Sequence, residues 1–346
     1  MDKFVVALTS FLVTLFVTPF AIKLSKSKGW VDIPNERKIH TTPMPRIGGV
    51  GILAGTISGL ILVFAYQHAS WVLWLLAICL LISLMGFWDD VKGLSFKVKF
   101  LFQIVGAILA IWLVGANIPY ITNPFSHARI EFGIFGPVVA LVWIVGITNA
   151  INLSDGLDGL AAGLSAISAL TLAVTSAKTN MVAALVALTV FSSAIAFLRY
   201  NFHPAKTFMG DTGSQLLGFI LAVISIKGAS LSASTLSLAI PLLAIGIPIL
   251  DTAYAFIRRM VKKGNPFLPD KMHIHHQLLS IGFSHVGAVL FMYMISGALA
   301  AIAILYRGKH ELTLLASYST IAIALLAFLK VMRMRTTRKN GRRKDV

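Results

Sequence analysis

Eleven long apolar runs divide almost the whole sequence, and they limit what this chain can fold into more than any other feature. Each run is about 17–25 residues long, the length at which a helix can span a bilayer. The 346 residues are 57% hydrophobic and only 12% charged, whereas a water-soluble domain is usually about 25% charged. The runs are about 3–22, 47–66, 71–88, 100–117, 136–153, 158–177, 181–198, 213–229, 234–257, 285–306 and 312–331. The sequence therefore predicts an all-α integral membrane protein with eleven transmembrane helices.

Basic residues fall mainly on one side of these predicted spans. If the N-terminus is outside, the cytoplasmic loops and tail carry 24 of the 30 Lys and Arg residues, and the other side carries six. Cytoplasmic loops are enriched in Lys and Arg, so the asymmetry predicts an outside N-terminus and a cytoplasmic C-terminus. The net charge of +17 could also suggest nucleic acid. However, anionic lipid headgroups explain the basic tail 333–346 better.

No separate soluble domain interrupts the apolar runs, so residues 1–332 are predicted to form a single polytopic membrane domain. Cys79 is the only cysteine, which excludes an intrachain disulfide. The unusual polar residues gather in five stretches, all at helix ends or loops on the predicted cytoplasmic side: 30–49, 87–93, 149–163, 199–214 and 270–279. Five such stretches on one side indicate one site at the inner membrane surface.

The stretch FWDDVKG places two adjacent carboxylates, Asp89 and Asp90, directly after an apolar span. A solvated loop is the alternative explanation. Adjacent carboxylates repel each other, so their place at the end of a span favours a cation or a shared proton as their partner. Ionisable groups at membrane depth are functional by default.

The stretch NAINLSDGLDGLAAG spaces Asn149, Asn152, Asp155 and Asp158 three residues apart. A helix turns about 100° per residue, so neighbouring members can share a face, but the first and last cannot. Helix capping would explain one of the carboxylates, but it would not explain four polar groups. The pattern favours a functional site.

Asp211 in MGDTGS lies just before another apolar run, and its local sequence fits equally a helix N-cap and a ligand for a hard cation. Asp251, within an apolar run, is equally consistent with a functional role and with a structural partner for a buried polar group.

The last polar stretch contains His273, His275 and His276. Zinc is the alternative ligand, but three histidines without a nearby cysteine are a weak zinc signal. Together with nearby basic residues they are better interpreted as phosphate donors, and Lys38, His40 and Arg46 in the first loop are further candidates. The remaining histidines are predicted to be ordinary surface or interface residues: His68, His127, His203, His285 and His310.

Acidic groups that can hold Mg²⁺ and basic groups that can hold phosphate together predict phosphoryl transfer. A site at the membrane surface suits one water-soluble nucleotide and one lipid phosphate. The predicted cytoplasmic active-site loops are 23–46, 89–99, 154–158, 199–213 and 258–284.

These residues also resemble a known family. FWDDVKG, NAINLSDGLDGLAAG, FMGDTGS and DKMHIHHQLL are similar to the signature stretches of the polyprenyl-phosphate N-acetylhexosamine-1-phosphate transferases. The resemblance implies a multi-pass enzyme of the bacterial cytoplasmic membrane. Such an enzyme transfers a sugar-1-phosphate from a UDP-sugar to a polyprenyl phosphate and releases UMP. It would use Mg²⁺, with Mn²⁺ as a substitute, and a homodimer is compatible with this architecture.

VDIPNERKIHTTPMPRIGG and DKMHIHHQLL are most similar to the WecA/TagO branch of this family. That branch uses UDP-GlcNAc and undecaprenyl phosphate in the first membrane step of cell-envelope polysaccharide synthesis. The branch that uses UDP-MurNAc-pentapeptide is the runner-up, because it typically has TPTMGG in the first loop and IHHH in the last. The choice among other UDP-HexNAc donors stays open.

Carried over by residue, the resemblance implies that Asp211, with Asn152 as co-ligand, holds Mg²⁺ on the donor diphosphate. The other catalytic candidates are Asp155 and Asp158 beside the nucleotide and metal, and Asp89 or Asp90 near the acceptor phosphate. The implied substrate-binding residues are Asn149, Asn152, Lys38, His40, Arg46, His273, His275 and His276. Direct attack by the lipid phosphate and a phospho-enzyme both stay open. The second pKa of a phosphomonoester, about 6, favours direct attack.

A polytopic transporter is the alternative from a different class. Transporters place their substrate and ion sites near the bilayer midplane, usually in repeated halves. In this sequence the carboxylates gather at helix ends and the halves do not look alike, so an enzyme is favoured.

Overall fold

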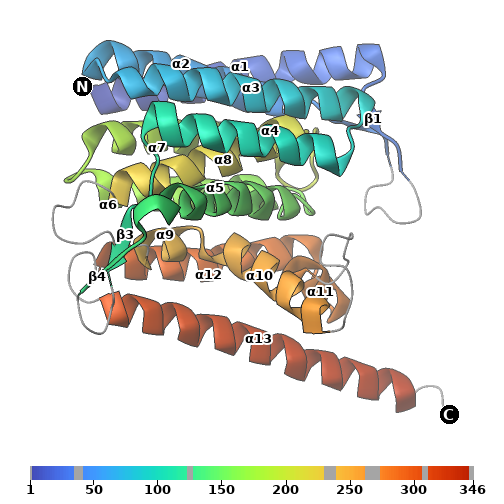
Figure 1. Cartoon of the computed structure of the whole chain (residues 1–346). Coiled ribbons are helices and arrows are strands. Elements are labelled where there is room, and N and C mark those ends of the chain that lie inside the picture. The colour runs from blue at the N-terminus through green and yellow to red at the C-terminus, as the bar shows by residue number, and fades with distance from the viewer. Residues whose placement is uncertain are drawn as a thin grey trace.

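The protein is an array of helices that lie side by side with their axes nearly parallel (Figure 1). The computed structural model describes residues 2–34, 42–122, 128–229, 239–261, 273–305 and 311–342. The helices of the first half are α1 (Asp2–Lys28), α2 (Gly49–Gln67), α3 (Ser70–Lys92), α4 (Phe96–Leu109) with its π-helical continuation η1 (Ala110–Val114), the 3₁₀ turn η2 (Gly133–Phe135) and α5 (Gly136–Leu153). Those of the second half are α6 (Leu160–Ser176), α7 (Met181–Asn201), α8 (Gly210–Ala229), α9 (Ala239–Ala244), α10 (Gly246–Val261), α11 (Ile274–Ser280), α12 (His285–Leu305) and α13 (Glu311–Arg342).

Two short antiparallel ribbons lie at opposite ends of the helices (Figure 1). In the first, β1 (Val31–Asp32) pairs with β2 (Met44–Pro45), with Asp32 opposite Met44. In the second, β3 (Tyr120–Thr122) pairs with β4 (Arg129–Glu131), with Ile121 opposite Ile130.

The prediction of an all-α integral membrane protein is confirmed. Within the described ranges, eight helical segments are long and apolar enough to cross a membrane: α1, α2, α3, α4 with η1, η2 with α5, α7, α8 and α12. Two of the other predicted spans contain shorter apolar helices, α6 and the segment Ala316–Phe328 of α13. The count of eleven spans and the orientation of the termini therefore stay predictions. Residues 333–342 of the predicted tail continue α13.

The run predicted as one span over 234–257 is divided at Ile245 into α9 and α10. Pro248 has no N–H to donate to the carbonyl of Ala244, four residues earlier, and a proline at this position breaks a helix. The hydroxyl of Ser168 on α6 donates to that carbonyl instead, at 2.7 Å. The break is thus stabilised by a neighbouring helix, as apolar surroundings require.

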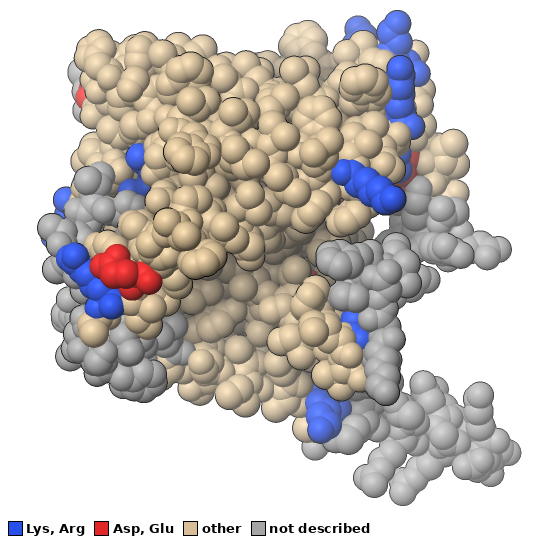
Figure 2. Space-filling model, viewed as in Figure 1, with Lys and Arg blue, Asp and Glu red and all other residues tan. Residues whose placement is uncertain are grey.

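Large apolar side chains point outward from the array as well as inward. On α1, Phe4, Phe16 and Phe20 are 63–72% exposed, as expected for a surface that faces lipid. On the face shown in Figure 2, charged side chains gather toward the two ends of the helices and leave the band between them almost bare. The centre is occupied by α8, where 83% of the apolar window is buried, compared with 28% in α1.

Most of the predicted polar stretches meet at one end of this array, the right end in Figure 1. The C-terminal ends of α3, α5 and α7 lie there with the N-terminal ends of α4, α8 and α12 and with β1 and β2. The predicted loop 89–99 is shorter than expected, because Asp89 and Asp90 continue α3 and Lys97 and Lys99 belong to α4. Ser95 begins α4 by accepting the backbone N–H of Val98.

The contact between α3 and α8 depends on Gly86 and can be tested there. A Cβ at Gly86 would lie 2.6 Å from backbone atoms of Asp211 and Thr212, and overpacking of this kind costs about 1–3 kcal/mol. We expect Gly86→Ala to lower the thermal unfolding midpoint of the detergent-purified protein. Gly146→Ala is the matched control, because nothing lies within 4 Å of a Cβ at that position. Equal midpoints for the two variants would contradict the close contact.

Candidate functional site

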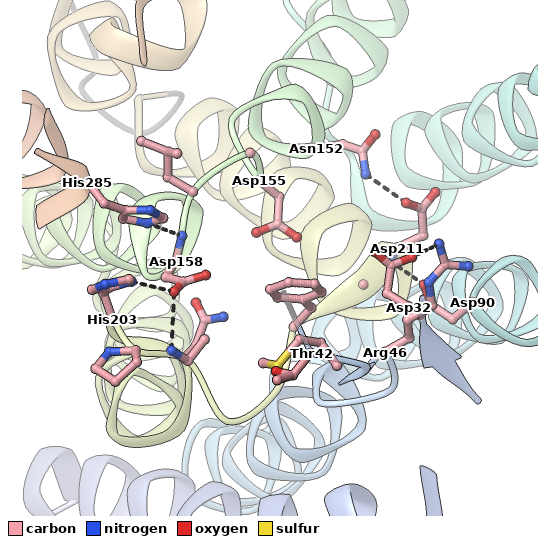
Figure 3. A pocket seen from close by; sticks show the side chains of 18 of the residues that line it. Asp32, Thr42, Arg46, Asp90, Asn152, Asp155, Asp158, His203, Asp211 and His285 are labelled. Carbon is pink, nitrogen blue, oxygen red and sulfur yellow. Dashed lines mark hydrogen bonds and ion pairs between the residues drawn. The ribbon is translucent and has the colours of Figure 1, made fainter. Parts of the chain in front are cut away.

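A cavity of about 610 Å³ opens at the end of the array where the polar stretches meet (Figure 3). This volume is in the usual range for small-molecule sites, about 300–1,000 Å³. Segments far apart in the sequence line it: the β1–β2 ribbon, the end of α3, the turn between α5 and α6, the loop between α7 and α8, α11 and the start of α12. The predicted site residues among the lining are Arg46, Asp89, Asp90, Asn152, Asp155, Asp158, Asp211 and His276.

The carboxylate of Asp90 caps the start of α8 from the neighbouring helix α3. One oxygen accepts the N–H of Asp211 at 2.7 Å, and the other accepts the N–H and the hydroxyl of Thr212 at 3.0 and 2.6 Å. These contacts satisfy N–H groups that a helix leaves unpaired in its first turn. The capping role that the sequence allowed for Asp211 thus belongs to Asp90, and the side chain of Asp211 points into the cavity.

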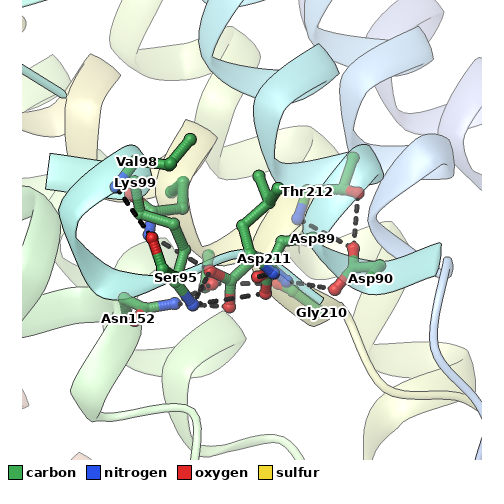
Figure 4. A network of polar contacts seen from close by, with 12 residues as sticks. Asp89, Asp90, Ser95, Val98, Lys99, Asn152, Gly210, Asp211 and Thr212 are labelled. Carbon is green, nitrogen blue, oxygen red and sulfur yellow. Dashed lines mark hydrogen bonds and ion pairs between the residues drawn. The ribbon is translucent and has the colours of Figure 1, made fainter. Parts of the chain in front are cut away.

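Lys99 bridges the two remaining carboxylates of this cluster (Figure 4). Its ammonium lies 3.2 Å from Asp89 Oδ2 and 3.0 Å from Asp211 Oδ2. Asp89 also accepts the N–H of Leu94 at 2.7 Å, which closes the turn between α3 and α4. The sequence interpretation counted Lys99 only among the basic residues that set the orientation. The one sign in the sequence that Lys99 could contact the carboxylates was its position ten residues after Asp89.

A chain of amides lies behind Asp211. Asn152 donates to Asp211 Oδ1 at 3.1 Å and Gln215 donates to Asp211 Oδ2 at 3.3 Å. Gln103 donates to Gln215 at 2.7 Å and exchanges hydrogen bonds with Asn149. Asn149 therefore lies outside the cavity lining, in the layer that orients the carboxylate. Asn152 meets Asp211 through its N–H, so service as a metal co-ligand would require its amide to turn over.

Asp155 has a different environment from its neighbours. It lines the cavity, yet within the described part of the chain its carboxylate has no hydrogen bond and no ion pair. Burial raises the pKa of Asp155 to about 8, and the nearby carboxylates of Asp211, Asp90 and Asp158 add to this rise. A carboxylate without a partner among three others is a position that a bound cation would stabilise.

The prediction that His203 and His285 are ordinary surface or interface residues is wrong, because both line the cavity (Figure 3). His203 Nδ1 lies 2.8 Å from Asp158 Oδ2, and His285 Nε2 accepts the backbone N–H of Asp158 at 2.9 Å. Their sequence neighbourhoods, FHPA and FSHVG, gave no sign of contact with Asp158. Only the fold brings the ends of α7 and α12 to that turn.

The three histidines of the HIHH stretch take separate positions. His273 Nδ1 lies 3.1 Å from Asp251 Oδ2, and Asp251 Oδ1 accepts the N–H of Ile274 at 2.7 Å. Of the two interpretations of Asp251, the structure supports that of a structural partner for buried polar groups. Its carboxylate anchors the start of α11.

The middle histidine packs against the turn between α5 and α6. A Cβ at Gly156 would lie 2.4 Å from His275 Nε2, so only glycine leaves room for the ring. Burial lowers the pKa of His275 to about 3, so this ring is neutral near pH 7. Of the three histidines only His276 lines the cavity.

Arg46 from the first loop reaches the cavity and forms an ion pair with Asp32, another lining residue that the sequence interpretation did not single out. Lys38 and His40 lie outside the described residues, so their predicted roles stay predictions. Three of the nearby basic residues that were grouped with the histidines as phosphate donors, Lys262, Lys263 and Lys271, also lie outside the described residues.

Among the residues that the structure describes, two groups of side chains have the spacing of metal ligands. Asp89, Asp90 and Asp211 form one, and Asp158, His203 and His285 form the other, each with ligand atoms within 4.8 Å of one another. Oxygen ligands suit a hard cation such as Mg²⁺, so the first group, with Asp155 nearby, fits that ion better. The fold and the site together define a multi-pass membrane protein with a carboxylate-rich cavity at one end of its helices.

Comparison with known proteins agrees with this description. The profile of glycosyl transferase family 4 matches residues 71–229. The chain is 41% identical to the probable undecaprenyl-phosphate N-acetylglucosaminyl 1-phosphate transferase of Bacillus subtilis, over 89% of this chain and 86% of that protein. It is 33% identical to the decaprenyl-phosphate N-acetylglucosaminephosphotransferase of Mycolicibacterium smegmatis, over 85% and 80%. It is 31% identical to the undecaprenyl-phosphate alpha-N-acetylglucosaminyl 1-phosphate transferase of Escherichia coli O157:H7, over 92% and 87%.

The chain belongs to glycosyl transferase family 4, the polyprenyl-phosphate N-acetylhexosamine-1-phosphate transferases, and to its WecA/TagO-type branch. It is therefore a membrane-bound transferase, and the resemblance found in its four polar stretches is confirmed.

Asp155→Asn tests the electrostatic environment of the cavity in protein washed free of divalent cations. The raised pKa means that the folded chain holds a proton that the unfolded chain has lost, so Asp155 costs stability as the pH rises from about 5 to about 8. We expect the asparagine variant to be more stable than wild type, by a margin that grows over this interval and then levels off. Asp2→Asn, at the exposed start of α1, is the control for the same substitution outside the cavity. A margin independent of pH would contradict the assigned environment.

Proposed function

We propose that this protein transfers GlcNAc-1-phosphate from UDP-GlcNAc to undecaprenyl phosphate, yielding undecaprenyl-diphospho-GlcNAc and UMP. The main support for this proposal is the cluster of carboxylates on the cavity wall, Asp89, Asp155 and Asp211. Lys99 forms ion pairs with two of them, Asp89 and Asp211. The names of the relatives support the donor and the acceptor. In the reaction, an oxygen of the lipid phosphate attacks the β-phosphorus of the donor. The bond from that phosphorus to the bridging oxygen breaks, and UMP leaves with the bridging oxygen.

The residues present fit a divalent cation. Asp89, Asp90 and Asp211 have suitable spacing, and Asp155 lacks a partner in the described structure. We assign Asp211, with Asp155 and Asn152 beside it, to holding Mg²⁺, which Mn²⁺ would replace. The bound cation would neutralise charge on the donor diphosphate, the main requirement of phosphoryl transfer. Asp90 would keep Asp211 in place through the first turn of α8.

The positive charges of the site would act on the phosphates. Lys99 is already between two carboxylates that face the cavity, and a phosphate oxygen could replace one of them as its partner. Asp89, released from Lys99, would then stand near the acceptor. Arg46 and His276 also line the wall and could donate to phosphate. Asn149, His273 and His275 would have supporting roles behind the cavity wall. Asn149 holds Gln103, which in turn bonds Gln215. His273 bonds Asp251 at the start of α11, and His275 packs against Gly156.

We further propose that the cavity faces the cytoplasm in the bacterial cytoplasmic membrane. The distribution of basic residues supports this orientation. Residues 1–332 would then be one catalytic domain of eleven spans, with 333–346 as its basic cytoplasmic tail. The acceptor phosphate would reach the carboxylates from the lipid headgroup layer, and the nucleotide would enter from the aqueous side.

The first test uses purified protein with undecaprenyl phosphate, Mg²⁺ and UDP-GlcNAc, and follows UMP release and the mass of the lipid product. We expect product that disappears when EDTA is added and returns with excess Mg²⁺. UDP-MurNAc-pentapeptide and other UDP-HexNAc donors are run in parallel, and product from one of these alone would correct the donor. No product from any donor, with the lipid verified in a second enzyme, would refute the reaction.

Single substitutions separate the carboxylate roles. Asp89→Asn and Asp211→Asn preserve shape and remove charge, and we expect each to lower the rate of UMP release at least about 100-fold, the scale on which a preorganised polar group affects a transition state. Asp2→Asn provides the matched control far from the cavity. A variant with near-normal turnover would remove that residue from the mechanism.

A further inference from the structure

Asp158 is held on two sides by histidines from distant parts of the chain. Its Oδ2 accepts hydrogen bonds from His203 Nδ1 at 2.8 Å and from the N–H of Ala205 at 3.2 Å. Its own backbone N–H donates to His285 Nε2 at 2.9 Å. The two imidazole rings stack with their centroids 4.3 Å apart and their planes 22° apart. Backbone and carboxylate of one residue are thus fixed together.

This arrangement leaves one carboxylate oxygen for the cavity. Both donors bind Oδ2, and within the described ranges Oδ1 has no hydrogen bond. Figure 3 shows this second oxygen of Asp158 directed toward the middle of the cavity. A carboxylate oxygen is an acceptor only, so this position can take an N–H or O–H group and would repel a phosphate.

The chemistry of the two substrates decides which of them such an acceptor can bind. A polyprenyl phosphate consists of an apolar chain and a phosphate, and it offers no neutral N–H or O–H group. A nucleotide sugar offers several, on its base, its ribose and its hexose. Asp158 also lies on the opposite side of the cavity from Asp90 and Asp211 in Figure 3. The acceptor oxygen therefore suits a neutral part of the nucleotide sugar, away from the reacting phosphates.

The same three side chains have metal-ligand spacing, but their contacts favour hydrogen bonding. The lone pair of His285 Nε2 is directed at the N–H of Asp158, and His203 Nδ1 is directed at the carboxylate. A metal ion would have to displace both contacts. The hydrogen bonds account for the observed geometry without an ion.

We propose that His203 and His285 are positioning residues that hold Asp158 for recognition of the nucleotide donor. The inference rests on the proposed function, since it assigns part of the donor site of that reaction. Loss of either contact would free Asp158 to turn or retract. Binding of the UDP-sugar would weaken, while the acceptor and the chemical step would be little affected.

The two contacts use different ring nitrogens, and this makes the test specific. The side-chain amide of asparagine is close to the position of Nδ1 in histidine, and that of glutamine is close to Nε2. His203→Asn should therefore keep the contact that His203→Gln loses, and His285→Gln should keep the contact that His285→Asn loses. His203 is 40% exposed, so neither amide at this position should prevent folding.

Steady-state kinetics on the four variants give the result. For His203→Asn and His285→Gln we expect a KM for UDP-GlcNAc within about threefold of wild type. For His203→Gln we expect a rise of about tenfold or more, as for the loss of a hydrogen bond to a charged group. For His285→Asn, which loses a neutral hydrogen bond to a backbone N–H, we expect a rise of about fivefold or more. The kcat at saturating donor and the KM for undecaprenyl phosphate should stay within about threefold in all four. Calorimetric binding of UDP-GlcNAc to each variant checks the same order without turnover.

Three outcomes would overturn the proposal: equal KM values for the two amides at each position, a fall in kcat in place of a rise in KM, or one equivalent of Zn²⁺ that survives EDTA washing in wild type and is lost in His203→Asn. If wild type makes no product from UDP-GlcNAc, the proposed function fails on its own. The affinities of the four variants for UDP are then compared by calorimetry. If they do not fall in the expected order, the positioning role of His203 and His285 is refuted.

Discussion

The hydrogen bonds from the carboxylate of Asp90 to the first turn of α8 are the contact on which the site depends. They join the end of α3 to the start of α8, the most enclosed of the eight candidate membrane-spanning helices in the described chain. Once these two ends are fixed, Asp89 and Asp211 stand on either side of Lys99, whose ammonium reaches both. A buried carboxylate is costly unless it is hydrogen-bonded, and unpaired N–H groups are costly in apolar surroundings. The carboxylate of Asp90 and the N–H groups of α8 therefore satisfy each other's need for a hydrogen-bond partner.

The bilayer explains why the chemistry gathers at one end of the helices. Along the middle of the array backbone polar groups must be paired within the protein, as at the break between α9 and α10, where the hydroxyl of Ser168 donates to the carbonyl of Ala244. Carboxylates without such partners can exist only where water or a ligand reaches them, which in this fold is the end of α3, α5 and α8. The apolar exterior and the acidic cavity are therefore two consequences of one constraint on where unpaired charge can stand.

Helix positions and the clustering of the carboxylates were predictable from the sequence, because apolar length and isolated polar stretches are local properties. Partners were not. Lys99 resembled any lysine near the end of an apolar run, and His203 and His285 sit in ordinary loop sequences. Their significance arises from contacts between residues more than 40 positions apart. The sequence left a capping role for Asp211 open for the same reason: a cap that another helix supplies to α8 leaves no trace near Asp211 in the sequence.

The repeated Asp-Gly pairs of SDGLDGL place two carboxylates three residues apart in one turn, yet their surroundings differ. Asp158 is bound by His203, Ala205 and His285, so its orientation is fixed before any ligand arrives. Asp155 has no such partner among the described residues, and its pKa is raised to about 8. A fixed acceptor suits selection of neutral donor groups, whereas a carboxyl group whose charged form has no partner suits a cation, which would stabilise that form. The turn, held by His275 against Gly156, would then set the distance between the part of the donor that is recognised and the diphosphate that reacts.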